Sequence, residues 1–252
     1  MSRALAVVRM GRERELAPFD LDVWYQPIHD PLAGDIDSWL AVLSDAEERR
    51  YQRFAFAKDR IHFAAAHALL RGVLSQYADI MPQHWQFSLN KWGKPAIANE
   101  GIANIGFNLT HTQGLVACGV VRTASIGIDA EWTARSIELD NLARGCLAPA
   151  ELAYFLSTPE EKQREVFFRL WTLKEAYIKA QGRGLSIALD SFSFELNPTD
   201  VTIRFATPEA DNANAWSFFE YQPTPEHHLA VAVPGSGSWN VNFRRATRQL
   251  SA

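Results

Sequence analysis

The sequence has only two cysteines, no long apolar run and no excess of positive charge, and each absence excludes a class of protein. Cys118 and Cys146 are too few for a disulfide framework or a thiolate zinc site, so we expect a reducing, cytoplasmic location. No stretch approaches the roughly 18 apolar residues of a membrane span, and the apolar segment at residues 4–8 is too short for a signal peptide. The net charge of -4 argues against general nucleic-acid or membrane binding.

The chain has 252 residues and 47% hydrophobic content, enough for a substantial core and for one large domain or two small ones. Ser44 and Glu47 form a capping box at the start of one helix. We expect residues 21–26 to form a strand at or near a sheet edge. Expected helices span residues 35–43, 44–54, 58–77, 149–156 and 166–184, and further strands span 102–112, 115–122, 125–132, 191–196, 201–206, 216–221 and 229–233.

Each half of the chain has one long helix followed by strands. Residues 102–122 and 216–233 both resemble hairpins, although the likeness in sequence is weak. The pattern predicts an α+β fold of two similar lobes, each a small, mainly antiparallel sheet packed on a long helix. We expect pseudo-two-fold symmetry between residues 1–123 and residues 124–252.

The helix expected at residues 166–184 is apolar around most of its circumference, which indicates burial, yet it contains three charged side chains. Glu175 and Lys179 are four residues apart and share a face with Trp171, whereas Lys174 points about 100° away. One interpretation is an ordinary surface ion pair worth about 0.2 to 0.5 kcal/mol. The other is a functional pair, because a charge among aromatic and aliphatic neighbours needs a partner or a role.

Asp129 and Glu131 are two residues apart on an expected strand, so their side chains leave the same face. Two carboxylates at the end of a buried strand repel each other, and a bound cation would remove that cost. Oxygen ligands without neighbouring cysteine or histidine favour Mg²⁺ over zinc. The alternative is an exposed strand end without function.

His111 follows Thr110 near the turn at Gln113 and Gly114. It is either a hydrogen-bond partner within the turn or, with Lys94 and Thr110, part of a phosphate site.

Five short motifs follow one another between residues 93 and 186, and together they are more specific than any one of them. They are Gly93–Pro95 (GKP), Phe107–His111 (FNLTH), Gly127–Glu131 (GIDAE), Trp171–Lys179 (WTLKEAYIK) and Gly182–Ser186 (GRGLS). In this order the chain resembles the 4'-phosphopantetheinyl transferase superfamily, in its larger two-lobed form, and the resemblance extends over about residues 44–196.

The resemblance implies a monomer that holds coenzyme A and Mg²⁺ between its lobes and modifies an acyl or peptidyl carrier protein. It implies a metal site at Asp129, Glu131 and Glu175. Glu175 is the expected base toward the carrier serine, directly or through a water, and Lys179 and His111 would stabilise developing negative charge. Residues expected to contact coenzyme A are Arg50, Lys58, Arg60, Lys94, Thr110, His111, Lys174 and Lys179.

The implied reaction transfers 4'-phosphopantetheine to a carrier serine and releases 3',5'-ADP. Two alternatives stay open at this stage: a Mg²⁺-dependent phosphohydrolase that uses the same carboxylates on water, and a non-catalytic scaffold that binds coenzyme A or a carrier.

Overall fold

The computed structural model describes residues 14–102, 104–122, 125–197, 200–207 and 215–247. The helices are α1 (Ala33–Leu40), α2 (Asp45–Arg53), α3 (Ala57–Leu74), α4 (Leu139–Cys146), α5 (Pro149–Ser157) and α6 (Glu160–Gln181). The strands are β1 (Asp20–Pro27), β2 (Phe87–Leu89), β3 (Pro95–Ile97), β4 (Gly106–Thr112), β5 (Leu115–Val121), β6 (Gly127–Trp132), β7 (Phe192–Leu196), β8 (Val201–Phe205), β9 (Trp216–Thr224), β10 (His227–Pro234) and β11 (Asn240–Arg245). Within the described ranges, no helix is both long and apolar enough to cross a membrane.

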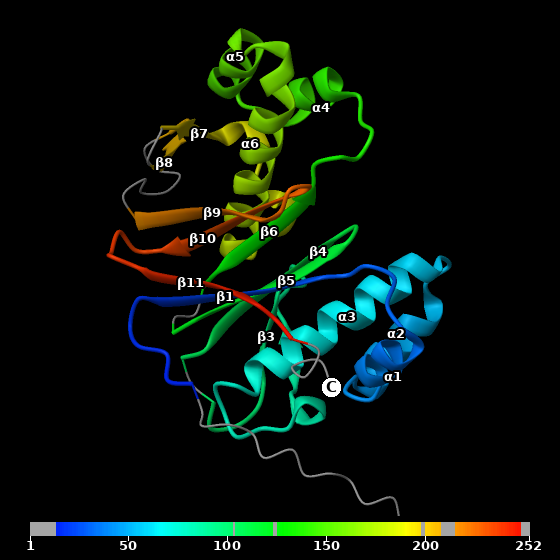
Figure 1. Cartoon of the computed structure of the whole chain (residues 1–252). Coiled ribbons are helices and arrows are strands. Elements are labelled where there is room, and N and C mark those ends of the chain that lie inside the picture. The colour runs from blue at the N-terminus through cyan, green and yellow to red at the C-terminus, as the bar shows by residue number, and fades with distance from the viewer. Residues whose placement is uncertain (1–13, 103, 123–124, 198–199, 208–214, 248–252) are drawn as a thin grey trace, which may run out of the picture.

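Two sheets lie between two long helices, so the centre of the molecule has four layers (Figure 1). Helix α3 packs on a sheet of order β11-β1-β5-β4, and α6 packs on a sheet of order β6-β10-β9. Alternate residues of β5 belong to two different cores. Val116 and Val120 pack against α3, whereas Leu115 and Val121 join the core between the sheets. A strand buried on both faces carries a continuous apolar run instead of an alternating one.

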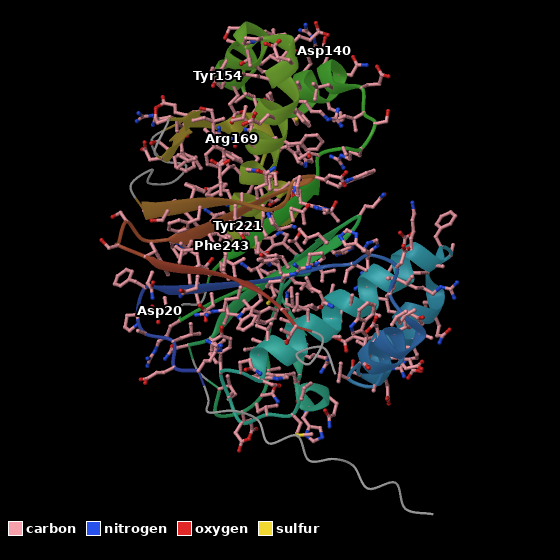
Figure 2. The ribbon with its side chains drawn as sticks, viewed as in Figure 1. Asp20, Asp140, Tyr154, Arg169, Tyr221 and Phe243 are labelled. Carbon is pink, nitrogen blue, oxygen red and sulfur yellow. The ribbon has the colours of Figure 1, made fainter. Side chains whose placement is uncertain are left out.

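The expected position of β1 at or near a sheet edge is confirmed, because β1 is the second strand of its sheet, next to the edge strand β11. The strand lies inside its sheet, antiparallel to β5 and parallel to β11, and Leu21 to Gln26 are all buried. The sequence analysis did not include β11, and this strand brings residues 240–245 from the second half of the chain into the first sheet. Phe243 of β11 stacks on Tyr221 of β9 with ring centroids 4.1 Å apart, which links the two sheets (Figure 2).

The hairpin predictions are confirmed, with β4 antiparallel to β5 and β9 antiparallel to β10. In each case the second hairpin strand also pairs antiparallel with an earlier strand, β1 in the first sheet and β6 in the second. The orders β1-β5-β4 and β6-β10-β9 therefore correspond. The chain is a mixed α+β protein, as predicted.

The capping box is confirmed at the start of α2, where Ser44 N donates to Glu47 Oε2 over 2.8 Å. Glu47 also forms an ion pair with the buried Arg71, with Arg71 NH2 2.7 Å from Glu47 Oε2, and His67 Nδ1 lies 2.7 Å from Glu47 Oε1. Burial alone would raise the Glu47 pKa, but His67, Ser44 and Arg71 lower it to about 2. Through these contacts Glu47 of α2 connects this helix to His67 and Arg71 of α3.

Candidate active site

Strand β6 presents two carboxylates to helix α6. Ile128 and Ala130 point into the core between the sheets, so Asp129 and Glu131 point to the opposite face, toward α6. The helix backbone approaches closely because residue 127 is glycine: a Cβ there would lie 1.9 Å from the Ala176 carbonyl oxygen. Close packing of helix on strand therefore places the acids against helix side chains.

Three helix residues spaced four apart, Trp171, Glu175 and Lys179, run along this strand. Trp171 Nε1 donates to Glu131 Oε1 over 2.7 Å, and Lys179 Nζ lies 2.6 Å from Asp129 Oδ1. Glu175 is half-buried, and its pKa is raised by burial and by the negative charge of Asp129. The predicted shared face of Trp171, Glu175 and Lys179 is thus directed at the two acids of β6.

Strand β4 supplies the third side of the site through alternate residues. Thr110 Oγ1 donates to Asp129 Oδ1 over 3.3 Å and lies 3.2 Å from Lys179 Nζ. On either side of it, Asn108 Oδ1 accepts from Ile128 N at 2.9 Å, and Thr112 Oγ1 accepts from Trp132 N at 3.2 Å. These contacts hold the edge strands of the two sheets together and bring Thr110 into the site.

The crowding of negative charge changes the chemistry of Glu131. Burial and the nearby Asp129 raise the Glu131 pKa to about 7, against the opposing effects of Arg135, Trp171 and Lys179. Arg135 NH1 lies 3.3 Å from Glu131 Oε2. A carboxyl group titrating near neutral pH in such a place is typical of a functional site.

The donor set fits a hard divalent cation. Asp129 Oδ2 is buried and has no hydrogen-bond partner, an arrangement that is costly for a carboxylate oxygen unless a ligand satisfies it. Asp129, Glu131 and Glu175 offer only oxygen ligands, which Mg²⁺ prefers. No group of three or more His, Cys, Asp or Glu side chains in the described part of the chain is gathered closely enough to hold a metal ion. Instead, the Lys179 ammonium provides the positive charge next to Asp129.

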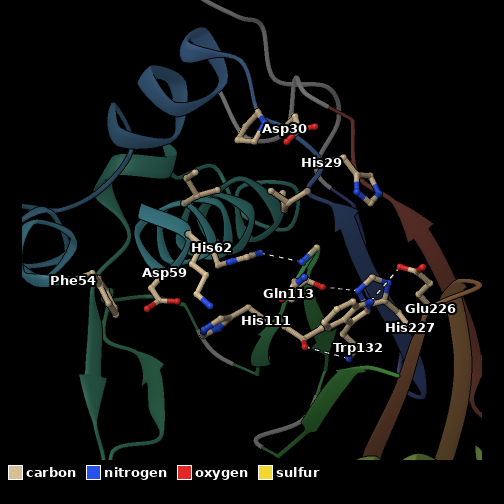
Figure 3. Close-up of a pocket in the computed structure, with 16 residues that line it drawn as sticks. His29, Asp30, Phe54, Asp59, His62, His111, Gln113, Trp132, Glu226 and His227 are labelled. Atoms are coloured by element: carbon tan, nitrogen blue, oxygen red, sulfur yellow. Dashed lines mark hydrogen bonds between the residues drawn. The ribbon is translucent and has the colours of Figure 1, made fainter. Parts of the chain in front are cut away.

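A cavity of about 590 Å³ is lined by both halves of the chain (Figure 3). Its lining includes His111 and Trp132, the residues that directly follow Thr110 and Glu131 in the sequence. Lys58 also lines it. Loss of hydration against neighbouring protein atoms lowers the His111 pKa to about 4, and electrostatic interactions with His62, Lys179, His67 and Arg50 act in the same direction. His111 is therefore a neutral hydrogen-bonding group at physiological pH, and Lys58 adds a positive charge.

Two residues expected to contact coenzyme A have other partners. Lys174 is fully buried, pairs with Glu151 at 2.8 Å and donates to the carbonyls of Leu189 and Phe192. Lys94 Nζ donates to two backbone carbonyls, those of Ile126 and Ala180. The prediction that Lys174 binds coenzyme A is wrong because no part of its side chain reaches solvent, and the Lys94 ammonium is committed to the backbone.

The remaining basic residues are near the cavity to different degrees. Lys58 lines it, and Arg50 lies over the ring of Phe63, 5.3 Å from the centroid, close enough to influence His111. Arg60 is half-buried on α3, and no described contact connects it to the site, so its role stays a prediction.

Three contacts were not predicted from the sequence. They are the hydrogen bond from Trp171 to Glu131, the ion pair between Arg135 and Glu131, and the contact of His62 with the turn between β4 and β5. The four-residue spacing of Trp171 and Glu175 indicates that Trp171 lies on the same helix face as Glu175, and this was the one sequence signal for the contact with Glu131. His62 Nε2 accepts from Gly114 N at 3.0 Å and so holds the turn between β4 and β5 (Figure 3). The two segments that this contact joins are 52 residues apart, so local sequence patterns carry no signal for it.

Comparison with known proteins identifies the class. Residues 125–232 match the model of the 4'-phosphopantetheinyl transferase superfamily, and residues 29–121 match that of the 4'-phosphopantetheinyl transferase N-terminal region. The chain is 35% identical over 226 residues to the 4'-phosphopantetheinyl transferase HetI of Nostoc, covering 89% of this chain and 91% of that protein. It is 27% identical over 198 residues to the transferase Sfp of Bacillus subtilis, covering 79% and 86%.

The chain belongs to the 4'-phosphopantetheinyl transferase superfamily. Within it, the matches to both halves place the chain in the larger type represented by HetI and Sfp. It is therefore an enzyme of this kind, and neither the phosphohydrolase nor the scaffold alternative is favoured.

Proposed function

We propose that this 4'-phosphopantetheinyl transferase moves the phosphopantetheine group of coenzyme A to a serine of an acyl or peptidyl carrier protein, with Mg²⁺, and releases 3',5'-ADP. The observation that carries the metal requirement is the unpartnered, buried Oδ2 of Asp129 beside two carboxyl groups whose pKa values are raised. Asp129, Glu131 and Glu175 would hold the ion, which supplies positive charge to the diphosphate as it reacts.

The protein's own residues account for the proton and the charge of this step. The serine oxygen bonds to the pantetheine-side phosphorus, the bond from that phosphorus to the oxygen of the leaving 3',5'-ADP breaks, and the hydroxyl proton goes to Glu175, directly or through a water. A raised pKa suits Glu175 to accept a proton near neutral pH. Lys179, between Asp129 and Thr110, would donate to phosphate oxygens.

His111 and Lys58 would bind coenzyme A in the cavity that they line, His111 as a neutral N–H donor and Lys58 as a cation. The cavity is bordered by residues from α3, the β4–β5 turn, the end of β6 and the start of β10, so a ligand there would contact both halves of the chain. Arg50 and Arg60 remain further candidates for the phosphates on the nucleotide side.

We further propose that residues 1–123 and 124–252 form two lobes related by pseudo-two-fold symmetry. Support comes from the corresponding strand orders β1-β5-β4 and β6-β10-β9, each with one long helix, α3 or α6, packed on it. Strand β11 would be an addition to this plan, contributed by the second lobe to the first sheet. The enzyme would act as a cytoplasmic monomer on coenzyme A and a carrier, without nucleic-acid or membrane partners.

Intact-protein mass spectrometry tests the reaction. Apo acyl and peptidyl carriers are incubated with coenzyme A and the enzyme, with Mg²⁺ or with excess EDTA, and 3',5'-ADP is measured by chromatography. We expect one phosphopantetheine group per carrier and an equal amount of 3',5'-ADP, only with Mg²⁺, and no change in a carrier whose acceptor serine is alanine. Equal loading in EDTA would refute the metal requirement, and release of 3',5'-ADP without any carrier would favour hydrolysis.

A further inference from the structure

The last turn of α6 is capped by side chains from elsewhere in the chain. Lys94 Nζ and Ser125 Oγ both donate to the Ala180 carbonyl, at 2.8 and 2.7 Å, and Asn90 Nδ2 donates to the Gly182 carbonyl at 2.9 Å. Carbonyls at the end of a helix have no partner within the helix, and a positive charge there is favoured by the helix dipole. Two of these three donors come from the turn between β2 and β3.

Lys94 also connects this helix end to the start of β6. Its Nζ donates to the Ile126 carbonyl at 3.0 Å, one residue before β6 begins. One ammonium group therefore joins residue 180, which follows Lys179, to residue 126, which is three residues before Asp129. Of the three N–H groups of Lys94, two are used in this way, so only one is left for any phosphate.

The position of Lys94 is itself fixed. Asn90 Oδ1 accepts from the Lys94 backbone N–H at 2.9 Å, and Asn90 N donates back to the Lys94 carbonyl at 3.0 Å. The Lys94 side chain passes directly over Gly182, where an added Cβ would lie 2.7 Å from Lys94 Cδ. Gly182 has a φ of +64°, which favours glycine for a second reason. The contacts of Lys94 with the carbonyls of Ile126 and Ala180 form a bridge, called the Lys94 bridge below. Lys94 is fixed both at its backbone, by Asn90, and at its ammonium group, by these two carbonyls.

We propose that Lys94 is a positioning residue for the transfer reaction: by joining the Ala180 and Ile126 carbonyls, it sets the position of α6 along β6 and hence the placement of Lys179 and Glu175 against Asp129. This inference rests on the proposed roles of those three residues. It assigns Lys94 to the transfer step and not to the binding of coenzyme A.

Steady-state kinetics separate the two roles. In Lys94→Met, which keeps the length of the side chain but has no donor, we expect kcat to fall about tenfold with KM for coenzyme A unchanged within about twofold, because misplacement of reacting groups slows the chemistry. Lys94→Arg, which can donate to both carbonyls, should recover part of kcat. Lys91→Met is the matched control, since Lys91 lies in the same turn but its ammonium is 4.0 Å from the Trp92 ring centroid, and it should leave both constants unchanged.

Hydrogen exchange provides a readout that does not depend on turnover. Peptides covering residues 176–184 should exchange faster in Lys94→Met than in wild type or Lys91→Met. Ser125→Ala, which removes one donor to the same carbonyl, should shift exchange and kcat in the same direction by less, and it keeps the test open if Lys94→Met does not fold. A rise of about tenfold or more in KM for coenzyme A with kcat retained would overturn the proposal, as would unchanged exchange at the end of α6. Absence of carrier loading by the wild-type enzyme would instead refute the proposed function. In that case hydrogen exchange at residues 176–184 would still show whether the Lys94 bridge holds the end of α6.

Discussion

Lys179 Nζ lies 2.6 Å from Asp129 Oδ1, while Oδ2 of the same carboxylate is buried without a hydrogen-bond partner. One oxygen thus holds helix α6 against strand β6, and the other is available to a ligand. Such a carboxylate has both a structural and a chemical role, and substitutions can separate the two.

Asp129→Asn keeps an oxygen for Lys179 but removes the negative charge. We expect the rate of carrier loading to fall about 100-fold or more, because stabilisation of charge at the reacting diphosphate is lost. Initial rates measured over a range of Mg²⁺ concentrations provide the test, with circular dichroism as the control for folding. Turnover close to that of the wild type would refute the assignment of Asp129 to the metal.

Glu131→Gln should make stability less dependent on pH. The folded-state pKa of Glu131 is about 7 and its ordinary value is 4.5, so the folded protein binds this proton more tightly than the unfolded chain. The free energy of unfolding of the wild type should therefore fall as pH rises from 4.5 through 7, with Glu131 accounting for about 3 kcal/mol. Urea unfolding at pH 5 and pH 8 without divalent cations, compared between wild type and variant, measures this contribution.

The variant should lose less stability than the wild type between these two pH values, and Mg²⁺ should stabilise the wild type more than the variant at pH 8. Identical pH dependence in the two proteins would mean that Glu131 is not the group responsible.

Lys174→Met should destabilise the protein without altering the affinity for coenzyme A. It leaves Glu151 buried without its 2.8 Å partner, and breaking a buried ion pair costs about 3 to 5 kcal/mol. Thermal and urea unfolding measure the loss, and the additional change Glu151→Gln should recover part of it. KM for coenzyme A, measured well below the melting temperature, should match that of the wild type; a large increase would restore Lys174 to the binding site.

Gly127→Ala should separate α6 from β6. The new Cβ would lie 1.9 Å from the Ala176 carbonyl oxygen and 2.3 Å from Ala180 N, and backbone atoms cannot move aside as a flexible side chain can. We expect a loss of about 3 kcal/mol or more in stability, together with loss of transfer activity. Gly145→Ala in α4 is the control, since no atom lies within 4 Å of its Cβ position, and it should be neutral or slightly stabilising. A soluble, fully active Gly127→Ala enzyme would show that the helix and strand can move apart.

The sequence by itself determined most of the local structure and the identity of the acids. Apolar periodicity, the capping box at Ser44 and the glycine after α6 predict helices whose hydrogen bonds are local, so no distant residue is needed to specify them. The two-residue spacing of Asp129 and Glu131, and the four-residue spacing of Trp171, Glu175 and Lys179, each fix a shared face.

Only the tertiary structure decided which partners these faces meet. The burial of β1 depends on β11, about 220 residues away in sequence, and nothing near either strand specifies that pairing. Lys174 and Lys94 resemble free cations in the sequence, but Glu151 and the carbonyls of Ile126 and Ala180 engage them in the fold. An ammonium group binds whichever acceptors surround it, and those acceptors come from segments that meet only when the sheets and helices pack.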